Sequence, residues 1–189
     1  MKQLILYCRA GFEKECAAEI QDKAGQHGVF GYCKLKNDSA YMVFEAYDSE
    51  ALAKFYRDFP FEQLVFVRQW ALVIGDVIEL PPTDRVSAVV ELAVGAELSP
   101  CGEIRVEYPD TNDGKELSTL ARKLTVPLRQ SLRQAGVMLP KQQSRAPVLH
   151  LFLLSGKQAY LALSYPENSS ELENGIRRLK FPNDAPSRS

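Results

Sequence analysis

The chain has 189 residues, a net charge of −1 at neutral pH, 46% hydrophobic residues and 25% charged residues. These values are close to the average of folded globular proteins, so they exclude a disordered chain and predict one or two domains with a real core. No run approaches the roughly 18 uninterrupted apolar residues of a membrane span, and no membrane partner is expected. Arg9 and Glu13 soon interrupt the first apolar run, which predicts a strand rather than a secretion signal and hence a cytoplasmic protein.

The first half of the sequence alternates strand-like and helix-like patterns. Asn37-Asp38-Ser39 lies between two of the strand-like runs and is typical of a hairpin turn. The expected elements are a strand over 2–8, a helix over 12–24, strands over 28–36 and 40–47, a helix over 49–59 and a strand over 63–75. This β-α-β-β-α-β order predicts a ferredoxin-like α+β domain over residues 1–80, with both helices on one face of an antiparallel sheet.

Pro81-Pro82 is the first clear boundary, and a second sandwich-like α/β unit is predicted over residues 81–165. Its expected elements are a helix over 84–94, a strand over 102–108, a long helix over 115–137 and a hairpin of strands over 147–155 and 158–165. From Pro166 onward nothing in the sequence is periodic. Residues 166–189 are therefore predicted to be a linker.

The sequence contains none of the common enzymatic motifs. It has no glycine-rich loop for a dinucleotide or a nucleotide phosphate, and no G-x-S-x-G nucleophile elbow. Its cysteines lack the paired spacing of a zinc site, so they are interpreted as buried small hydrophobic residues. They are Cys8, Cys16, Cys33 and Cys101. The sequence therefore predicts no catalytic residue, no metal site and no cofactor site in this chain.

The run DTNDGKE at 110–116 resembles a calcium loop but fails at two ligand positions. It is better interpreted as the start of a helix, with Asp113 as the N-cap and Glu116 three residues later. Pro127 is expected to kink or divide the helix that follows, after Val126.

One surface of this helix carries charge of a single sign. At 100° per residue, four of its cations fall within an arc of about 40°, and a fifth extends the stripe sideways. The four are Lys115, Arg122, Arg129 and Arg133, and the fifth is Lys123. The residues expected to pack on the opposite side are Leu117, Leu120, Leu124, Leu128 and Ala135. Residues 115–145 contain seven Lys or Arg and one acidic residue, whereas a solvated helix face ordinarily mixes signs to form ion pairs.

The last fifteen residues add a second basic cluster. Two such clusters in the same half favour a polyanionic partner, and Arg can hold a phosphate with two hydrogen bonds. Few aromatic residues accompany them, so recognition of backbone and shape is expected rather than base stacking. The predicted RNA-binding residues are Lys115, Arg122, Lys123, Arg129, Arg133, Lys141, Arg145, Arg177, Arg178, Lys180 and Arg188. A plain solvated surface remains the alternative.

Five blocks spread along the chain resemble one family. They are YCRAGFEKECAAEI (7–20), FPFEQLVFVRQW (59–70), RVEYPDTNDGKEL (105–117), RKLTVPLRQSLRQAGV (122–137) and RLKFPNDAPSRS (178–189). They are similar to the N-terminal portion of the bacterial 23S rRNA cytidine 2′-O-ribose methyltransferases of the RlmM type. The resemblance implies a ferredoxin-like domain followed by a THUMP domain, which is an RNA-binding module, and 23S rRNA as the partner.

In that family, the last block leads into a methyltransferase domain that binds S-adenosylmethionine and carries a Lys-Asp-Lys-Glu catalytic set. No position of this chain matches those residues. The resemblance therefore implies S-adenosylmethionine in the parent enzyme but not in this chain, with the missing methyltransferase domain as a partner. The implied role is to bind and orient the RNA. Two alternatives stay open: the THUMP module of a tRNA-modifying enzyme, and a protein-interaction module that docks the catalytic domain.

Overall fold

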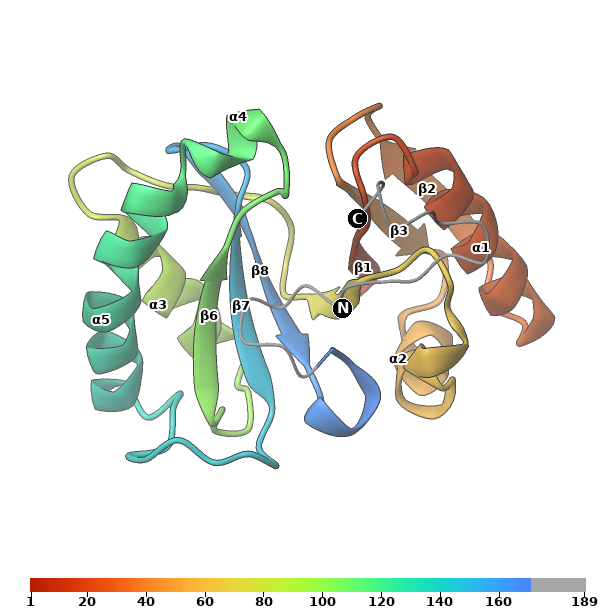
Figure 1. Ribbon diagram of the computed structural model, residues 1–189. Coiled ribbons are helices and arrows are strands. Elements are labelled where there is room, and N and C mark those ends of the chain that lie inside the picture. Colours follow the sequence, from red (N-terminus) through yellow and green to blue (C-terminus); the bar gives the residue numbers. More distant parts are fainter. Residues whose placement is uncertain (171–189) are drawn as a thin grey trace.

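The computed structural model describes residues 1–170, and these residues form one mixed sheet with helices packed against it (Figure 1). The strand order is β2-β3-β1-β4-β8-β7-β6, and β5 pairs with β8. The strands are β1 (Gln3–Tyr7), β2 (Gly31–Leu35), β3 (Tyr41–Ala46), β4 (Gln69–Val73), β5 (Ile78–Glu79), β6 (Glu103–Glu107), β7 (Val148–Leu153) and β8 (Gln158–Ser164). The helices are α1 (Glu13–Gln26), α2 (Ser49–Asp58), α3 (Arg85–Gly95), α4 (Asn112–Lys115) and α5 (Ser118–Gln134), with 3-10 turns η1 (Phe61–Gln63) and η2 (Pro166–Asn168).

The first four strands and two helices adopt the predicted ferredoxin-like arrangement. Both β3 and β4 pair antiparallel with β1, and β2 pairs antiparallel with β3. The buried carboxylate of Glu13, at the start of α1, accepts hydrogen bonds from the backbone N–H groups of Gly11, Asp38 and Ala40. This one side chain therefore holds the start of the first helix against the predicted hairpin turn.

The last strand of this half is shorter than the sequence predicts. Instead of covering 63–75, it is limited to β4, and the turn η1 precedes it. The backbone N–H groups of Val65 and Phe66 donate to the carboxylate of Glu19 on α1, at 2.7 and 2.9 Å. Because these donors bond to a side chain, this part of the apolar run does not pair as a strand.

The strands of the second half continue the same sheet. β4 and β8 are antiparallel neighbours, with Leu72 opposite Leu163, whereas β6 is parallel to β7. The two units expected to be separate sandwiches therefore share one sheet through backbone pairing. Since Leu72 packs with α1 and α2 and Leu163 packs with α3 and α5, the helices of both halves cover the same face.

The opposite face of the sheet is concave, and an apolar cluster lies at its centre. The sheet coils so strongly that the rings of Tyr7 on β1 and Phe152 on β7 meet at a centroid distance of 4.6 Å, although β4 and β8 separate these strands. Ile5, Val73 and Ala162 are buried around them. Burial of a large apolar side chain such as Phe152 contributes about 1.5–3 kcal/mol, so this core holds the two halves together.

The long helix predicted over 115–137 is divided, but the predicted division after Val126 is wrong. The break lies between α4 and α5, and Pro127 stands inside α5, which runs through it. Pro127 removes one backbone donor, but Leu124 and Leu128 are buried on either side of it. Their packing holds the helix together across the proline.

The start of this region also differs from the prediction, and Asp113 is not the N-cap. Thr111 has that role, and its Oγ1 accepts a hydrogen bond from the N–H of Gly114 at 2.8 Å. A Cβ atom on Gly114 would lie 2.0 Å from the carbonyl oxygen of Pro109. The backbone passes so close at this turn that only glycine fits.

Three of the four cysteines are buried as predicted, and Cys33 is half-buried. Across residues 1–170, His, Cys, Asp and Glu side chains form no group of three that could hold a metal ion. None of the helices in this range has the length and apolar character needed to cross a membrane.

Candidate nucleic-acid interface

The predicted cations of the second half occupy α4, α5 and the loop that follows them. Lys115 ends α4, whereas Arg122, Lys123, Arg129 and Arg133 lie on α5, and Lys141 and Arg145 lie in the loop before β7. Within residues 1–170, no ion pair joins any of these seven side chains to a carboxylate. The other four predicted residues, Arg177, Arg178, Lys180 and Arg188, lie outside the described residues.

The packing of α5 explains why its cations remain outside the core. The buried residues recur at spacings of three and four, which is the pattern of one helix face. They are Ala121, Leu124, Leu128 and Leu132. Leu117 and Leu120 are half-buried against the same core. Ala135 is exposed, so its predicted packing is wrong, because α5 ends at Gln134 and Leu132 fills the last buried position.

The four cations of α5 divide into an outer pair and an inner pair. Arg122 and Lys123 are exposed, whereas Arg129 and Arg133 are half-buried beside the packed face. The Nε of Arg133 donates to the carbonyl oxygen of Leu139 at 3.2 Å. This bond orients the guanidinium group without neutralising its charge.

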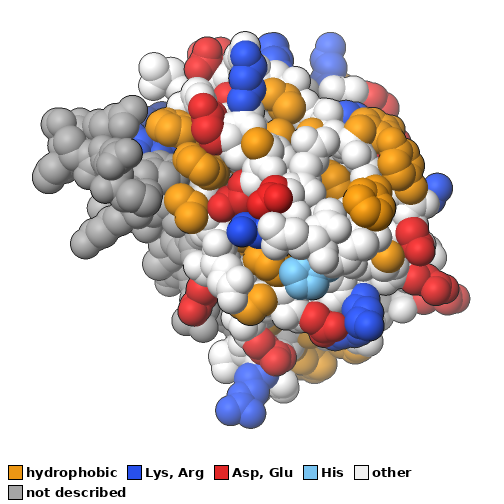
Figure 2. Space-filling view, turned by 90° about the vertical axis from the view of Figure 1, so that its right-hand side faces the viewer, with side chains coloured by type: hydrophobic (Ala, Val, Ile, Leu, Met, Phe, Trp, Pro, Cys, Tyr) orange, Lys and Arg blue, Asp and Glu red, His pale blue; other side chains and the backbone are white. Residues whose placement is uncertain are grey.

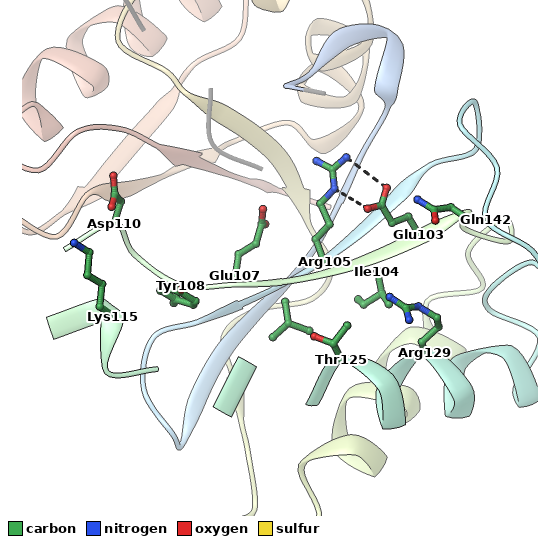
Figure 3. A pocket seen from close by; sticks show the side chains of 11 residues that line it. Glu103, Ile104, Arg105, Glu107, Tyr108, Asp110, Lys115, Thr125, Arg129 and Gln142 are labelled. Atoms are coloured by element: carbon green, nitrogen blue, oxygen red, sulfur yellow. Dashed lines mark hydrogen bonds and ion pairs between the residues drawn. The ribbon is translucent and has the colours of Figure 1, made fainter. Parts of the chain in front are cut away.

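A groove of about 550 Å³ runs along β6, which is an edge strand of the sheet. In Figure 3, Glu103, Arg105 and Glu107 project to one side of β6, and Thr125 and Arg129 lie on the side of α5. Lys115 and Gln142 stand at its two ends.

A smaller pocket of about 190 Å³, lined by Arg129 and Arg133 among others, extends this groove. The two hollows therefore bring together Lys115, Arg129 and Arg133. The other four described cations, Arg122, Lys123, Lys141 and Arg145, do not line either of them.

The residues of β6 were not predicted to belong to the site. Arg105 pairs with Glu103, with 3.2 Å between Nε and Oε1, and its Nη1 lies 3.5 Å from the carbonyl oxygen of Ser170. The available signal was the alternation of polar residues with Ile104 and Val106, which gives a strand one polar face. That pattern alone does not indicate which helix lies beside the strand.

Glu107 belongs to a buried hydrogen-bond network that crosses the concave face. Its Oε1 accepts a hydrogen bond from the Tyr7 hydroxyl at 2.7 Å and lies 2.7 Å from Nδ1 of His150. Nε2 of His150 lies 2.6 Å from Oγ of Ser164. Burial raises the pKa of Tyr7 well above its usual value, and the negative charge of Glu107 raises it further. The phenol therefore stays protonated and acts as the donor.

The segment after β8 is anchored to the N-terminal half, although it was predicted to be the start of a linker. The side-chain amide of Asn168 donates to the carbonyl oxygens of Tyr56 and Phe59, at 2.9 and 2.6 Å. Its oxygen accepts from the N–H of Phe61 at 2.7 Å, and the indole of Trp70 donates to the Asn168 carbonyl at 2.7 Å. These bonds fix where the chain leaves the second half.

Two family descriptions match the chain in succession. Residues 1–71 match the RlmM ferredoxin-like domain, and residues 84–165 match ribosomal RNA large subunit methyltransferase M, N-terminal. Proteins named ribosomal RNA large subunit methyltransferase M are 47% identical in Vibrio atlanticus and 48% identical in Pectobacterium atrosepticum, in both cases over the whole chain. The chain spans about half the length of these curated relatives, 52% and 51% respectively.

Solved structures share the fold at low identity. TrmN from Thermus thermophilus aligns with a TM-score of 0.53 at 15% identity, over 89% of this chain and 47% of TrmN. PH1313 from Pyrococcus horikoshii aligns with a TM-score of 0.50 at 9% identity, over 87% of this chain and 54% of PH1313.

The two matched descriptions make the chain a two-part α+β region, with a ferredoxin-like domain followed by a domain described as N-terminal. It belongs to the ribosomal RNA large subunit methyltransferase M family, and both halves of the shared sheet are covered by the family's own domain descriptions.

Proposed function

We propose that this region binds 23S rRNA and orients it for a methyltransferase domain in the part of the relatives that the chain does not cover. The observation that carries the proposal is the group of seven cations without a carboxylate partner in residues 1–170. The name of the relatives supports rRNA as the ligand. In this proposal, residues 1–80 are a ferredoxin-like domain, 81–165 a THUMP domain and 166–189 the connection to the methyltransferase domain, in a cytoplasmic enzyme.

The physical basis of the proposed binding is phosphate neutralisation. Lys and Arg bound to phosphates release condensed counterions, which gives affinity without reading sequence. Holding the RNA in place makes the following reaction effectively unimolecular. Such positioning can remove about 7–11 kcal/mol of barrier in favourable cases.

S-adenosylmethionine belongs, in this proposal, to the methyltransferase domain, where it supplies the methyl group. The described residues do not fit this cofactor. Nucleotide cofactors are commonly held at the end of a parallel strand, where a glycine-rich turn leads into a helix. Within residues 1–170, the parallel pair of strands is β6 and β7, and β6 is followed by Tyr108-Pro109-Asp110 instead of such a turn. We assign no step of methyl transfer to this chain.

Titration of labelled 23S rRNA fragments with the 189-residue chain tests the proposal. If about four phosphates are neutralised, affinity should fall roughly a hundredfold between about 50 and 200 mM salt. Binding that is absent at the lower salt, or that does not change with salt, contradicts the proposal. Transfer RNA is the comparison ligand, and tighter binding to it would instead indicate a tRNA-modifying enzyme.

The edge of the sheet at β2 favours a second function, which is contact with protein. Phe30, Tyr32 and Tyr47 are 63%, 42% and 71% exposed, and the rings of Tyr32 and Tyr47 are 6.3 Å apart. Exposed aromatic side chains beside an unpaired strand edge are typical of protein interfaces. We propose that this edge docks the methyltransferase domain. Phe30→Ser combined with Tyr47→Ser should prevent capture of the separately expressed domain without changing RNA affinity, and undiminished capture would contradict this role.

A further inference from the structure

Lys115 lies on a short, compact turn after β6, which is called the α4 turn below and covers residues 109–115. Lys115 ends α4, a helix of only four residues, and its side chain is exposed. Its backbone N–H donates to the carbonyl oxygen of Thr111 at 3.0 Å, and Gly114 lies against the backbone of Pro109. A helix this short has little stability of its own. The place of Lys115 therefore depends on the contacts that hold the α4 turn.

The N-terminal half holds the α4 turn through an ion pair. Nη1 of Arg68 lies 2.9 Å from Oδ2 of Asp110, and the Arg68 side chain is only 12% exposed. The backbone N–H of Arg68 donates to the carbonyl oxygen of Tyr7 on β1 at 2.7 Å. The cation of the pair is thus fixed on the N-terminal part of the sheet. Because this cation is shielded from water, salt screens the pair less than it screens a fully exposed one.

Packing between the halves supports the same position of the α4 turn. Pro109 is buried and, together with Tyr7 and Cys8, lines a hollow that is too small for a water molecule. Just before the turn, Glu107 accepts a hydrogen bond from the Tyr7 hydroxyl at 2.7 Å. The base of the turn therefore packs on the N-terminal half, and the ion pair of Asp110 fixes its exposed side.

We propose that Asp110 is a positioning residue for RNA: held by Arg68, it keeps Lys115 where the ammonium group meets a phosphate. This inference rests on the proposed function, because it specifies how the N-terminal half contributes to the same binding. Asp110 and Lys115 stand at the same end of the groove along β6 (Figure 3). Within residues 1–170, however, the Asp110 carboxylate pairs with Arg68, and no ion pair joins it to Lys115.

The sign of its charge distinguishes this role of Asp110 from a direct electrostatic one. A carboxylate beside a phosphate-binding surface repels the RNA, so its neutralisation ordinarily strengthens binding. If Asp110 positions Lys115, its neutralisation weakens binding instead, because Lys115 loses its fixed place. The two effects therefore have opposite directions.

Asp110→Asn tests the inference in a titration with labelled 23S rRNA fragments between about 50 and 200 mM salt. We expect roughly threefold weaker binding at the lower salt, which is the order of magnitude of a partly exposed ion pair. The slope of log K against log salt should become flatter by up to about 0.9, since one phosphate contact is loosened.

Asp113→Asn is the matched control, because it removes the same charge from another exposed position of the α4 turn. It should leave the affinity unchanged or raise it by less than about twofold. Asp110 is itself exposed, so both variants should fold, and thermal unfolding verifies this.

A Lys115→Ala background separates positioning of this residue from a general loosening of the chain. In that background, Asp110→Asn should cause no further loss of affinity, because the side chain that it positions is gone. A loss as large as in the unchanged background would show that Asp110 does not act through Lys115, and it would overturn the inference.

Tighter binding by Asp110→Asn also overturns the inference, as do equal effects of Asp110→Asn and Asp113→Asn. In either case, salt-dependent binding by the unchanged chain leaves the proposed function intact. The absence of salt-dependent binding by the unchanged chain would contradict the proposed function itself.

Discussion

The two halves of the molecule use their charged side chains differently. In the N-terminal half, Glu13 and Glu19 accept hydrogen bonds from backbone N–H groups, and Lys34 pairs with Glu45 at 3.5 Å. On the side that carries α1 and α2, acids, bases and hydrophobic side chains are interspersed (Figure 2). On α4, α5 and the following loop, by contrast, seven cations are gathered in residues 115–145 beside a single acidic residue, and none of the seven has a carboxylate partner within residues 1–170.

This difference separates charges that the fold needs from charges that a ligand can use. A buried carboxylate with several backbone donors stabilises the native state, and its loss should be seen as unfolding. An exposed cation without a partner contributes little to stability. Its loss should be seen in binding alone.

The largest expected effect is on the N-terminal side of this comparison. Glu13→Gln replaces one of the oxygens that face the N–H groups of Gly11, Asp38 and Ala40 with a donor, at a position only 1% exposed. We expect the free energy of unfolding to fall by about 3–5 kcal/mol, measured by urea denaturation. Glu15 is an exposed neighbour on the same helix and serves as the control. Glu15→Gln should change the free energy of unfolding by less than about 0.5 kcal/mol. Equal effects of the two variants would refute the structural role of Glu13.

A smaller effect is expected at the contact between the halves. Asn168→Ala removes three side-chain hydrogen bonds to the backbone of the N-terminal half. We expect a loss of about 2–3 kcal/mol in the free energy of unfolding, because the backbone groups left behind are partly shielded from water. Glu167→Ala, at the exposed residue beside it, should have almost no effect. If Asn168→Ala is as stable as the unchanged chain, the segment is not anchored in solution.

The smallest effect on stability is expected at Asp84, a carboxylate of the second half that accepts hydrogen bonds within the protein. Asp84 caps α3, and hydrogen bonds from the hydroxyl and the backbone N–H of Ser87 lower its pKa. Because the folded pKa lies below the unfolded value of about 3.9, the stabilisation is present above that pH and is lost as pH falls through the folded pKa.

Asp84→Asn keeps a capping side chain but cannot titrate. The unchanged chain should melt slightly higher than Asp84→Asn at pH about 7, and the difference should vanish at pH about 2. A difference in melting temperature that is constant across this range would show that the carboxylate charge is not involved.

Local patterns in the sequence were sufficient to predict most elements of the fold. Apolar alternation and the turn at Asn37-Asp38-Ser39 predicted the N-terminal strands, and leucine spacing predicted the buried face of α5. The two-residue strand β5 was missed, since Ile78 and Glu79 are too few to form a pattern. The predicted strand over 63–75 is shortened at its start because the backbone N–H of Val65 bonds to Glu19, a residue more than forty positions away.

The candidate site was only partly predictable for the same reason. Charge and helical spacing identify Lys115, Arg129 and Arg133 from their own segment. The contact of Glu107 with Tyr7 joins residues 100 positions apart, and it depends on the coiling of a sheet that both halves share. Neither residue has a local signal for this role.

The salt dependence of RNA affinity in two charge-reversed variants tests the account most directly. The first variant is Arg122→Glu with Arg129→Glu on α5, and the second is Lys14→Glu with Lys54→Glu on the exposed sides of α1 and α2. The account predicts that the first variant flattens the slope of log K against log salt by about two, and that the second leaves it unchanged. Equal slopes for both variants would contradict it.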